Sequence, residues 1–540
     1  MMTLNQSKIL LISHDLSLTG AVKILLKICQ KLKSENFTLQ IWTSKYGSLE
    51  KDFTTIATTR YIAVEPPEYR QYHSVSDFYV SQAKCIASIR QAIYLFDPDL
   101  VYINTTVCPE MLIAAKELGK SVVLHIHEIE NYVKSPENIL MKANLELADS
   151  KIAVSQASIN WFNQQFNIDT SDWVRIPAFI DAEQIEFKIA SYNLIQIESE
   201  LGILPDTFFL LGSGVVSQEK GLDLWIETCL KVINYFPNKD IKCIWMGKVL
   251  PDFEPFYKDQ IDKIPDNIKK KIIFLGELEN PYPYIKRANI LFLSSRAEAF
   301  SISLIEAMYL RVPVLSFACG GPNEILSLEA KNLIKEFDSE KAADYIINGI
   351  KSGYFPQSNE NPREYVCENY LSKSAIDKVV DQIKERLSSG QRIKSSSFIT
   401  EYLKLRIKAL ADCIETSYVG KEFVELNHSD NTSVEELLKI EQVLISYLDA
   451  QTRIKLKQTQ SQLQKTNDGL EIFKFHIKAT QEALAQTNSQ LHQTQVELAD
   501  TQLQLGQAQV TIAGMESSKF WKLRTAWLKF KQKIGIPTDE

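Results

Sequence analysis

The chain of 540 residues lacks the features that mark several specialised classes of protein. Its eight cysteines include no C-x-x-C pair, which suits reduced thiols in a cytosolic protein better than a disulfide framework. No apolar run approaches the roughly 20 residues that span a bilayer, and the run KILLIS at 8–13 is too short for a signal-peptide core. The net charge of -7 gives no general basis for binding nucleic acid. We therefore expect a soluble or peripheral cytoplasmic protein that binds no nucleic acid.

Histidines and carboxylates are likewise not grouped at the spacing of metal ligands. The triplet Asp97-Pro98-Asp99 places two carboxylates close together, but Pro98 ends the preceding predicted helix and Asp99 introduces the next strand. We therefore expect no bound metal and no other cofactor.

Short apolar runs alternate with segments of helical spacing, which is typical of α/β domains with parallel sheets. Hydrophobic residues make up 45% of the chain, and its length predicts two or more domains. We predict two Rossmann-like domains that face a cleft, residues 1–185 and residues 186–388. The strands expected in them are 9–13, 39–43, 100–104, 122–126, 208–211, 243–247, 272–276, 290–293 and 313–317.

The most informative stretch is SSRAEAFSISLIEAM at 294–308. It follows the buried-strand run Ile290–Leu293, and Ser301 stands where a helix N-cap is expected. Glu298 lies in the loop, and Glu306 lies eight residues later inside the predicted helix. In a parallel sheet, ligands bind at the carboxyl ends of the strands, and a helix N-terminus there favours an anion.

Glu298 and Glu306, with Phe300 between them, resemble the E-x7-E motif of retaining glycosyltransferases of the GT-B fold, and family 4 is the best match. In that family the first glutamate approaches the donor sugar, and the second binds the ribose hydroxyls of the nucleotide. The resemblance implies that Glu298 is catalytic and that Phe300, Ser301 and Glu306 bind the donor. The family usually has glycine where this chain has Ser301, which bears on how closely the backbone approaches the sugar phosphate.

Further segments between residues 8 and 388 carry the same resemblance. Lys220, in Glu219-Lys220-Gly221-Leu222-Asp223, matches a lysine that binds the donor diphosphate, and such a cation would stabilise the leaving group. Gly20 matches a glycine beneath a phosphate, and Gly320-Gly321 match a loop whose backbone lies beside the sugar phosphates. A simple turn is the alternative for these glycines. Most relatives add an arginine five residues before the lysine, whereas this chain has Val215.

His127 is the site residue expected from the opposite domain. His125 and His127 end one predicted strand, and the alternation of side chains places both on the same side. The family has a histidine at this strand end near the reacting sugar, and His127 is the better match. Its imidazole could bond a sugar hydroxyl or move a proton near neutral pH. A core histidine is the alternative for both, and Glu128 is a weaker candidate.

The resemblance implies a metal-independent, hexosyltransferase-type retaining enzyme. It would move a sugar from a nucleotide-diphosphate-sugar donor to a hydroxyl of a glycan acceptor, such as a cell-surface polysaccharide or a lipid-linked glycan. Two alternatives stay open. Val215 and Ser301 also fit a catalytically decayed scaffold protein, and a sugar-nucleotide epimerase of the same fold would need no acceptor.

Beyond residue 388 the composition changes, and we predict a helical connector at 389–455 and a coiled coil at 456–515. Leucine or isoleucine recurs at every seventh position from Leu456 to Ile512. Such a heptad repeat is typical of a left-handed coiled coil, so we expect a homo-oligomer through 456–512.

A basic amphipathic tail is predicted at 516–540. Six Lys or Arg and no acidic residue lie between Lys519 and Lys533, and Leu523, Trp527 and Phe530 follow a helical spacing. This pattern favours a helix at 519–536 that lies on an anionic membrane surface, at the inner face of the membrane. A partner-binding helix is the alternative.

Overall fold

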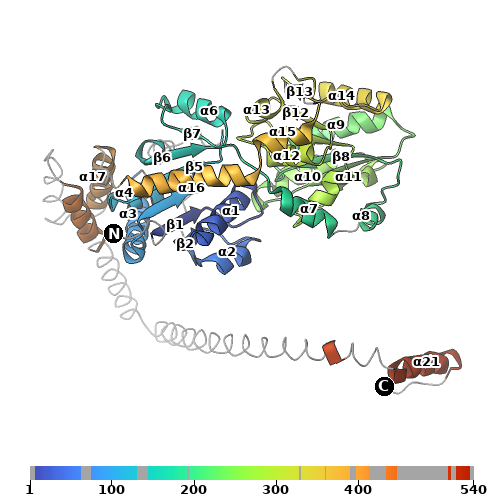
Figure 1. Cartoon of the computed structure of the whole chain (residues 1–540), viewed down its shortest axis with the longest axis horizontal. Helices are drawn as coiled ribbons and strands as arrows, with labels where there is room; N and C mark the ends of the chain where they lie inside the picture. The colour runs from blue at the N-terminus through green and yellow to red at the C-terminus, as the bar shows by residue number, and fades with distance from the viewer. Residues whose placement is uncertain are drawn as a thin grey trace, which may run out of the picture. The chain divides into compact units, whose positions relative to one another are not determined.

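The computed structural model describes residues 7–62, 75–129, 144–191, 194–327, 330–358, 360–389, 397–412, 433–446, 509–511 and 519–535. The chain divides into two compact units, Met1–Leu448 and Asp449–Glu540. The first unit holds two parallel sheets with helices on their faces (Figure 1). The predicted α/β fold with two Rossmann-like domains is confirmed.

The first sheet has the strand order β3-β2-β1-β4-β5-β6-β7, and its strands are parallel. Helices cover both faces of the central strands, which explains why β1, β4 and β5 are largely apolar rather than alternating, whereas the edge strand β3 is polar and mostly exposed. The strands are β1 (Lys8–Ser13), β2 (Thr38–Thr43), β3 (Thr58–Tyr61), β4 (Leu100–Ile103), β5 (Ser121–Ile126), β6 (Ser150–Ala153) and β7 (Val174–Arg175). The helices are α1 (Gly20–Ser34), α2 (Glu50–Ile56), α3 (Val75–Phe96), α4 (Pro109–Glu117) and α6 (Gln156–Phe166).

The second sheet has the order β10-β9-β8-β11-β12-β13 and is also parallel. Its strands are β8 (Phe208–Ser213), β9 (Ile241–Met246), β10 (Ile272–Phe274), β11 (Ile290–Leu293), β12 (Val314–Phe317) and β13 (Leu333–Ile334). The helical elements are α7 (Ala182–Ala190), α8 (Leu194–Leu201), α9 (Leu222–Tyr235), η3 (Pro251–Phe253), α10 (Glu254–Asp262), η4 (Lys269–Lys271), α11 (Tyr282–Arg287), α12 (Ile302–Tyr309), α13 (Pro322–Leu326) and α14 (Ser339–Ser352).

In both sheets the strand order reverses at a central strand. β1 lies between β2 and β4, and β8 lies between β9 and β11. The loops that leave the carboxyl ends of such neighbours diverge, and this leaves a crevice in which ligands bind. The two sheets therefore each offer one such crevice.

Two helices return the chain to the first domain after the second sheet is complete. They are α15 (Pro362–Asn369) and α16 (Ser372–Ser388), and α16 packs on α1 and on β4, β5 and β6 (Figure 1). Two backbone hydrogen bonds of 2.9 Å each link the segment that leaves the first domain to the segment that returns to it. Ile180 N–H donates to Tyr370 O, and Ser372 N–H donates to Ile180 O. The ion pair between Lys31 and Asp377, at 2.9 Å, also holds α16 on α1.

The described part of the predicted connector buries apolar residues. It contains α17 (Ser397–Asp412), which packs on α3 and α4, and a helix at 434–446. Leu403, Ile407 and Leu410 form a core with Leu437 and Leu444. The apolar face of these helices therefore covers part of the first domain.

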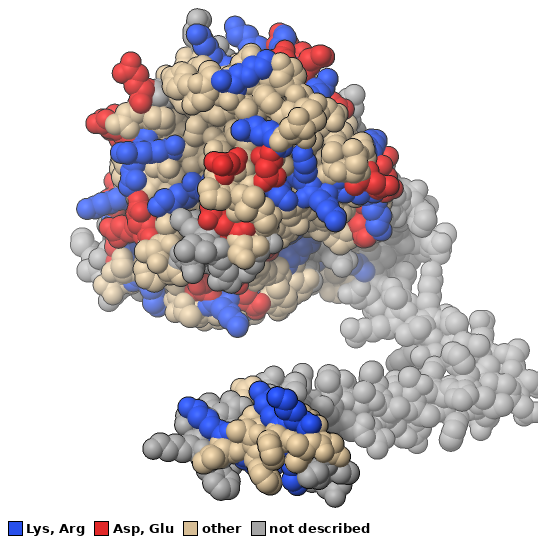
Figure 2. Space-filling model, turned by 90° about the vertical axis from the view of Figure 1, so that its right-hand side faces the viewer, with Lys and Arg blue, Asp and Glu red and all other residues tan. Residues whose placement is uncertain are grey.

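In the second unit the structure describes α21 (Lys519–Lys533) and a short helical piece at 509–511. The rest of the predicted coiled coil lies outside the described residues. Leu523, Trp527 and Phe530 are all more than half exposed on α21, and Figure 2 shows blue Lys and Arg beside tan, uncharged residues on this helix. None of the helices in the described ranges is long and apolar enough to cross a membrane.

Candidate functional site

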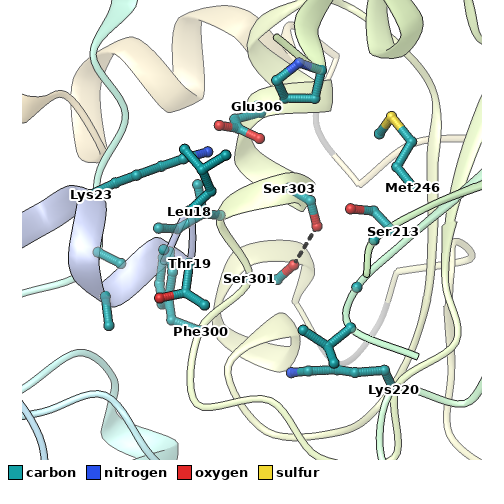
Figure 3. Close-up of a pocket in the computed structure, with 18 of the residues that line it drawn as sticks. Leu18, Thr19, Lys23, Ser213, Lys220, Met246, Phe300, Ser301, Ser303 and Glu306 are labelled. Atoms are coloured by element: carbon teal, nitrogen blue, oxygen red, sulfur yellow. Dashed lines mark hydrogen bonds between the residues drawn. The ribbon is translucent and has the colours of Figure 1, made fainter. Parts of the chain in front are cut away.

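A cavity of about 380 Å³ lies between the two domains of the first unit. The loop after β1 and the start of α1 line one side of it, and the carboxyl ends of β8 and β9 and the N-terminus of α12 line the other (Figure 3). The lining residues with polar side chains are Thr19, Lys23, His127, Ser213, Lys220, Lys248, Glu277, Glu298, Ser301, Ser303 and Glu306.

Lys220 and Glu298 form an ion pair at this cavity, although they are 78 residues apart in sequence. Lys220 Nζ lies 2.9 Å from Glu298 Oε1, and the same oxygen accepts a hydrogen bond of 2.7 Å from Ser295 Oγ. Burial lowers the pKa of Lys220, but the carboxylates of Glu298 and Glu219 more than offset it, so its pKa is above the ordinary value. Lys220 is therefore a cation at any physiological pH.

The Gly320-Gly321 loop supports Glu298 and does not line the cavity. Glu298 N–H donates to Cys319 O, and Gly321 N–H donates to Glu298 O, both at 2.8 Å. A Cβ at Gly320 would lie 2.4 Å from Glu298 O, so only glycine permits this approach. Neither glycine is among the residues that line the two cavities, and Gly321 donates its N–H to Glu298, so binding of the donor by Gly320 and Gly321 stays a prediction.

Ser301 is the N-cap of α12, as predicted. Its Oγ accepts the N–H of Leu304 at 3.3 Å and lies 3.2 Å from Ser303 Oγ. Both serines line the cavity, so the first turn of α12 faces it. Because the side chain of Ser301 caps the helix, it takes over one of the free N–H groups that a glycine would leave open.

Glu306 is buried and lines the cavity, so it is not a solvated helix charge. Burial raises the pKa of its carboxyl, while the positive charge of Lys23 and a hydrogen bond from Tyr282 oppose that shift. Lys23 extends from α1 toward Glu306 in Figure 3. A buried carboxylate that faces a cation across a cavity is suited to accept hydrogen bonds from hydroxyl groups of a ligand.

His127 lies in the cavity with a defined tautomer. Its Nε2 is 3.1 Å from Asn104 Oδ1, and Asn104 Nδ2 donates to Ala21 O at 3.0 Å. Because Asn104 uses its amide N–H on Ala21, its oxygen must accept from His127, so Nε2 carries the proton and Nδ1 is an acceptor. Burial, reinforced by the charge of His14, lowers the pKa of His127 to about 3.

His125 is a core residue instead. Its ring is 2% exposed, its Nδ1 shares a hydrogen bond with the hydroxyl of Tyr102, and it lines neither described cavity. The two histidine rings are 4.1 Å apart, so the predicted alternation onto one side is correct. Glu128 accepts the N–H of His127 at 3.0 Å and lines a second cavity.

The other predicted donor-binding residues also meet at the cavity. Gly20 begins α1 and lines it from the first domain. Phe300 is nearly buried and packs edge-on against Tyr370, with ring centroids 5.4 Å apart. Phe300 also lines the second cavity, so it forms part of the boundary between the two spaces.

The second cavity, of about 270 Å³, adjoins the first at the catalytic candidates. His127, Lys220, Glu298 and Phe300 line both. Its remaining walls are His14, Thr106, Val107, Glu128, Ile129, Trp161, Phe162, Phe166, Glu219, Ala297 and Ala299. Two spaces that share one cation, one carboxylate and one imidazole can hold two molecules with their reacting atoms at the shared boundary.

Sequence reasoning missed three residues that contribute to this site: Lys23, Asn104 and Lys248. Asn104 directly follows β4, and a polar residue at a strand end beside the switch point was a usable signal. Lys23 lies in the first turn of α1, where its spacing from Gly20 places it on the cavity side. Lys248 follows β9, and nothing in the local sequence marks it. Across the described ranges no three His, Cys, Asp or Glu side chains are grouped to hold a metal ion.

Two family profiles match successive parts of the chain. Residues 18–184 match the family described as Glycosyltransferase Family 4, and residues 195–368 match that described as Glycosyl transferases group 1. This chain belongs to the group 1 glycosyltransferase family. The first match covers the first sheet except β1, the second covers the whole second sheet, and together they contain every predicted site residue.

The individual relatives that this chain matches are distant. N-acetyl-alpha-D-glucosaminyl L-malate synthase of Bacillus anthracis is 24% identical over 44% of this chain and 60% of that protein. The lipopolysaccharide core biosynthesis mannosyltransferase LpsB of Rhizobium meliloti is 26% identical over 28% of this chain and 43% of its own length. The chain thus spans about half the length of the curated relatives it matches.

Solved structures show the same GT-B fold. HepE of Anabaena, in complex with UDP-glucose, superposes with a TM-score of 0.58 at 18% identity, covering 70% of this chain and 100% of that one. WaaG, a glycosyltransferase involved in lipopolysaccharide biosynthesis, gives a TM-score of 0.53 at 16% identity, covering 69% of this chain and 99% of the other. At such low sequence identity, the similarity to these structures shows a shared fold alone.

Proposed function

We propose that this protein is a retaining, metal-independent glycosyltransferase that moves a sugar from a nucleotide-diphosphate sugar to a hydroxyl of a glycan. The observation that carries the proposal is the ion pair between Lys220 and Glu298, 2.9 Å apart, at the boundary shared by two cavities. Membership of the group 1 family and the UDP-glucose bound by HepE support a nucleotide sugar as the donor.

We assign the larger cavity to the donor. Glu306 accepts the ribose hydroxyls, and Lys220 neutralises the diphosphate near the first turn of α12. When the bond from the anomeric carbon to the diphosphate oxygen breaks, negative charge grows on that oxygen. Lys220 is already in place as a cation, so its stabilising effect increases as the charge develops. Lys220 and the N-terminus of α12 supply positive potential without a metal.

We assign the smaller cavity to the acceptor. Its aromatic wall, Trp161 and Phe166, suits the apolar face of a sugar ring, and Glu128 and Glu219 suit hydroxyl groups. Beside His127 the acceptor oxygen bonds to the anomeric carbon while the bond from that carbon to the diphosphate oxygen breaks, and the acceptor's hydroxyl proton passes to the departing diphosphate oxygen. Since the low pKa of His127 keeps its ring neutral, its Nδ1 accepts a hydrogen bond from a sugar hydroxyl and does not act as a cation.

The test of this proposal is turnover across a panel of UDP-, GDP- and ADP-sugars, with and without oligosaccharide acceptors. We expect release of the nucleoside diphosphate with at least one donor and a new glycoside when an acceptor is present. Release of nucleotide with an epimerised free sugar and no glycoside would instead identify an epimerase. No turnover with any donor, together with no nucleotide binding, would contradict the proposal and favour a scaffold.

We also propose that α21 binds an anionic membrane surface. Trp527 and Phe530 stack with ring centroids 5.9 Å apart, are both more than half exposed, and share the helix with six basic and no acidic side chains. Each Lys or Arg near an anionic surface contributes about 1 kcal/mol, so binding should weaken as salt screens it. Aromatic rings beside basic side chains are typical of helices that lie in the membrane interface.

Co-sedimentation with vesicles, with and without anionic lipid, tests the membrane proposal by comparing the full chain with a chain ending at residue 515. The full chain should sediment more, and equal sedimentation would contradict the proposal. Oligomerisation through 456–512 remains a prediction, because all of that segment except 509–511 lies outside the described residues. It predicts that a chain ending at 450 has fewer protomers per particle than the full chain.

A further inference from the structure

We propose that Lys248 supplies the second positive charge for the donor diphosphate, replacing the arginine that position 215 lacks. The inference rests on the proposed function and deepens it by assigning a further donor-binding residue. Lys248 and Val215 both line the larger cavity, together with Lys220. The positive charge that is missing after β8 is thus supplied by the lysine that follows β9.

The backbone fixes Lys248 beside position 215. β8 and β9 are paired in register up to Ser213 and Met246, and the two chains continue side by side beyond the sheet. There Gly214 N–H donates to Met246 O, and Val216 N–H donates to Lys248 O, both at 2.9 Å. These two bonds lie on either side of Val215. Lys248, which accepts the second bond, therefore lies next to Val215.

Gly247 makes this close approach possible. Its φ is +148°, and a Cβ there would lie 1.8 Å from Gly214 O, so any other residue would push the two loops apart. Its N–H donates to Gly276 O at 2.8 Å, which holds the turn from the other side. Gly214, in the loop after β8, lies against Lys220. A Cβ at Gly214 would be 3.3 Å from the Cβ of Lys220. Lys220 and Lys248 therefore flank the same short loop.

The ammonium of Lys248 is only loosely engaged in this structure. Its Nζ lies 3.5 Å from Glu277 Oε1, and its side chain is 29% exposed. A pair of that length and exposure contributes little to stability, so leaving it for a diphosphate costs little. Glu277 keeps a second partner, because its Oε2 accepts a hydrogen bond of 3.1 Å from Ser48 Oγ in the first domain. Lys248 thus lines the cavity and is free to turn toward a ligand in it.

Two other cations near the cavity are less suited to this role. Arg296, beside the loop after β11, is bound in a bidentate manner by Asp223 at 2.7 and 2.8 Å and does not line the cavity. Lys23 faces Glu306, the residue that we assign to the ribose. Lys248 is the lysine that combines a cavity position with a place next to Lys220.

The test uses the full chain and isothermal calorimetry with UDP, GDP and ADP as probes, at low and high salt. Lys248→Ala should weaken binding of the preferred nucleoside diphosphate by about tenfold to a hundredfold, the usual effect of losing a charge-assisted hydrogen bond. It should affect the corresponding monophosphate less, and it should reduce the salt dependence. Lys242→Ala, which removes a partly exposed lysine outside both cavities from β9, the strand that Lys248 follows, is the matched control and should change little.

The decisive variant combines Lys248→Ala with Val215→Arg. An arginine at 215 should restore most of the lost affinity, since it returns a cation to the same short loop. Wild-type protein that binds a diphosphate, with unchanged affinity in Lys248→Ala, would overturn this inference and leave the proposed function standing. Wild-type protein that binds none of the three diphosphates would overturn the proposed function, and this inference with it. Lys248→Gln, which keeps the length of the side chain, checks that any loss follows the charge.

Discussion

Replacing Arg406 by alanine should strongly destabilise the first unit, although this residue is far from the predicted site residues in sequence. The Arg406 side chain is fully buried, with Nη2 2.6 Å from Glu117 Oε1 and Nε 2.8 Å from Glu441 Oε1. Arg90 binds the same two carboxylates at 2.6 and 3.1 Å. Two arginines and two glutamates thus join α3, α4, α17 and the helix at 434–446.

The expected loss of stability follows from the imbalance of buried charge that Arg406→Ala creates. Arg406→Ala leaves one arginine to neutralise two buried carboxylates, and removing one partner of a buried ion pair typically costs about 3–5 kcal/mol. Burial already raises the pKa of Glu441, while Arg406 opposes that shift. Without Arg406, the pKa of Glu441 in the folded state should rise further. The variant should therefore lose more stability as pH rises above the unfolded pKa of a glutamate, about 4.3.

Urea unfolding of the full chain, followed by circular dichroism at pH 5 and pH 8, measures this effect. Lys408→Ala is the control, because Lys408 is an exposed residue of the same helix and its loss should change the free energy of unfolding by less than about 0.5 kcal/mol. A loss below about 1 kcal/mol for Arg406→Ala, or a loss equal to that of the control, would refute the view that this network holds the helices of 397–446 on the first domain.

Two further predictions concern the site and the core beneath it. Glu306→Ala should weaken UDP or GDP binding by about tenfold to a hundredfold, since a buried acceptor of ribose hydroxyls is lost; calorimetry showing unchanged affinity would contradict that role. Burial, reinforced by His127, holds the pKa of His125 well below 6.5, so the unfolded chain takes up this proton first and stability must fall as pH drops below about 6.5. Between pH 7 and pH 5 the loss of stability due to His125 is at most about 2 kcal/mol. His125→Gln should reduce the loss of unfolding free energy at acid pH by a similar amount in urea titrations. An identical pH dependence in the variant and the wild-type protein would contradict a buried, neutral His125.

The sequence predicted the parallel sheets and the meeting of Lys220, Glu298, Glu306 and His127 well, for a physical reason. Strands buried on both faces are apolar throughout, so they are visible as short runs, and the run 290–293 matches β11 residue for residue. The carboxyl ends of neighbouring parallel strands must lie at the same edge of a sheet. Polar residues placed just after those runs are therefore brought together by the topology alone.

Other features could not be read from the chain because they depend on neighbours across the sheet. Lys248 compensates for Val215 through the pairing of β8 with β9, and no motif along the chain contains that relation. Gly320 and Gly321 follow the same sequence pattern whether or not their backbone supports Glu298, so only the structure shows that support. The burial of Arg406 was hidden because charged residues inside a helical segment usually indicate a solvated face.

The most direct test of the central claim is the turnover number of Lys220→Ala with the donor that the wild-type protein uses best. Lys258→Ala is the control, because that lysine belongs to an exposed ion pair with Glu254 on α10. If Lys220 stabilises the departing diphosphate, its loss should lower kcat by about a hundredfold to a thousandfold while the control keeps wild-type activity. Equal kcat values for Lys220→Ala and the wild-type protein would contradict the assignment of this cavity as the site of sugar transfer.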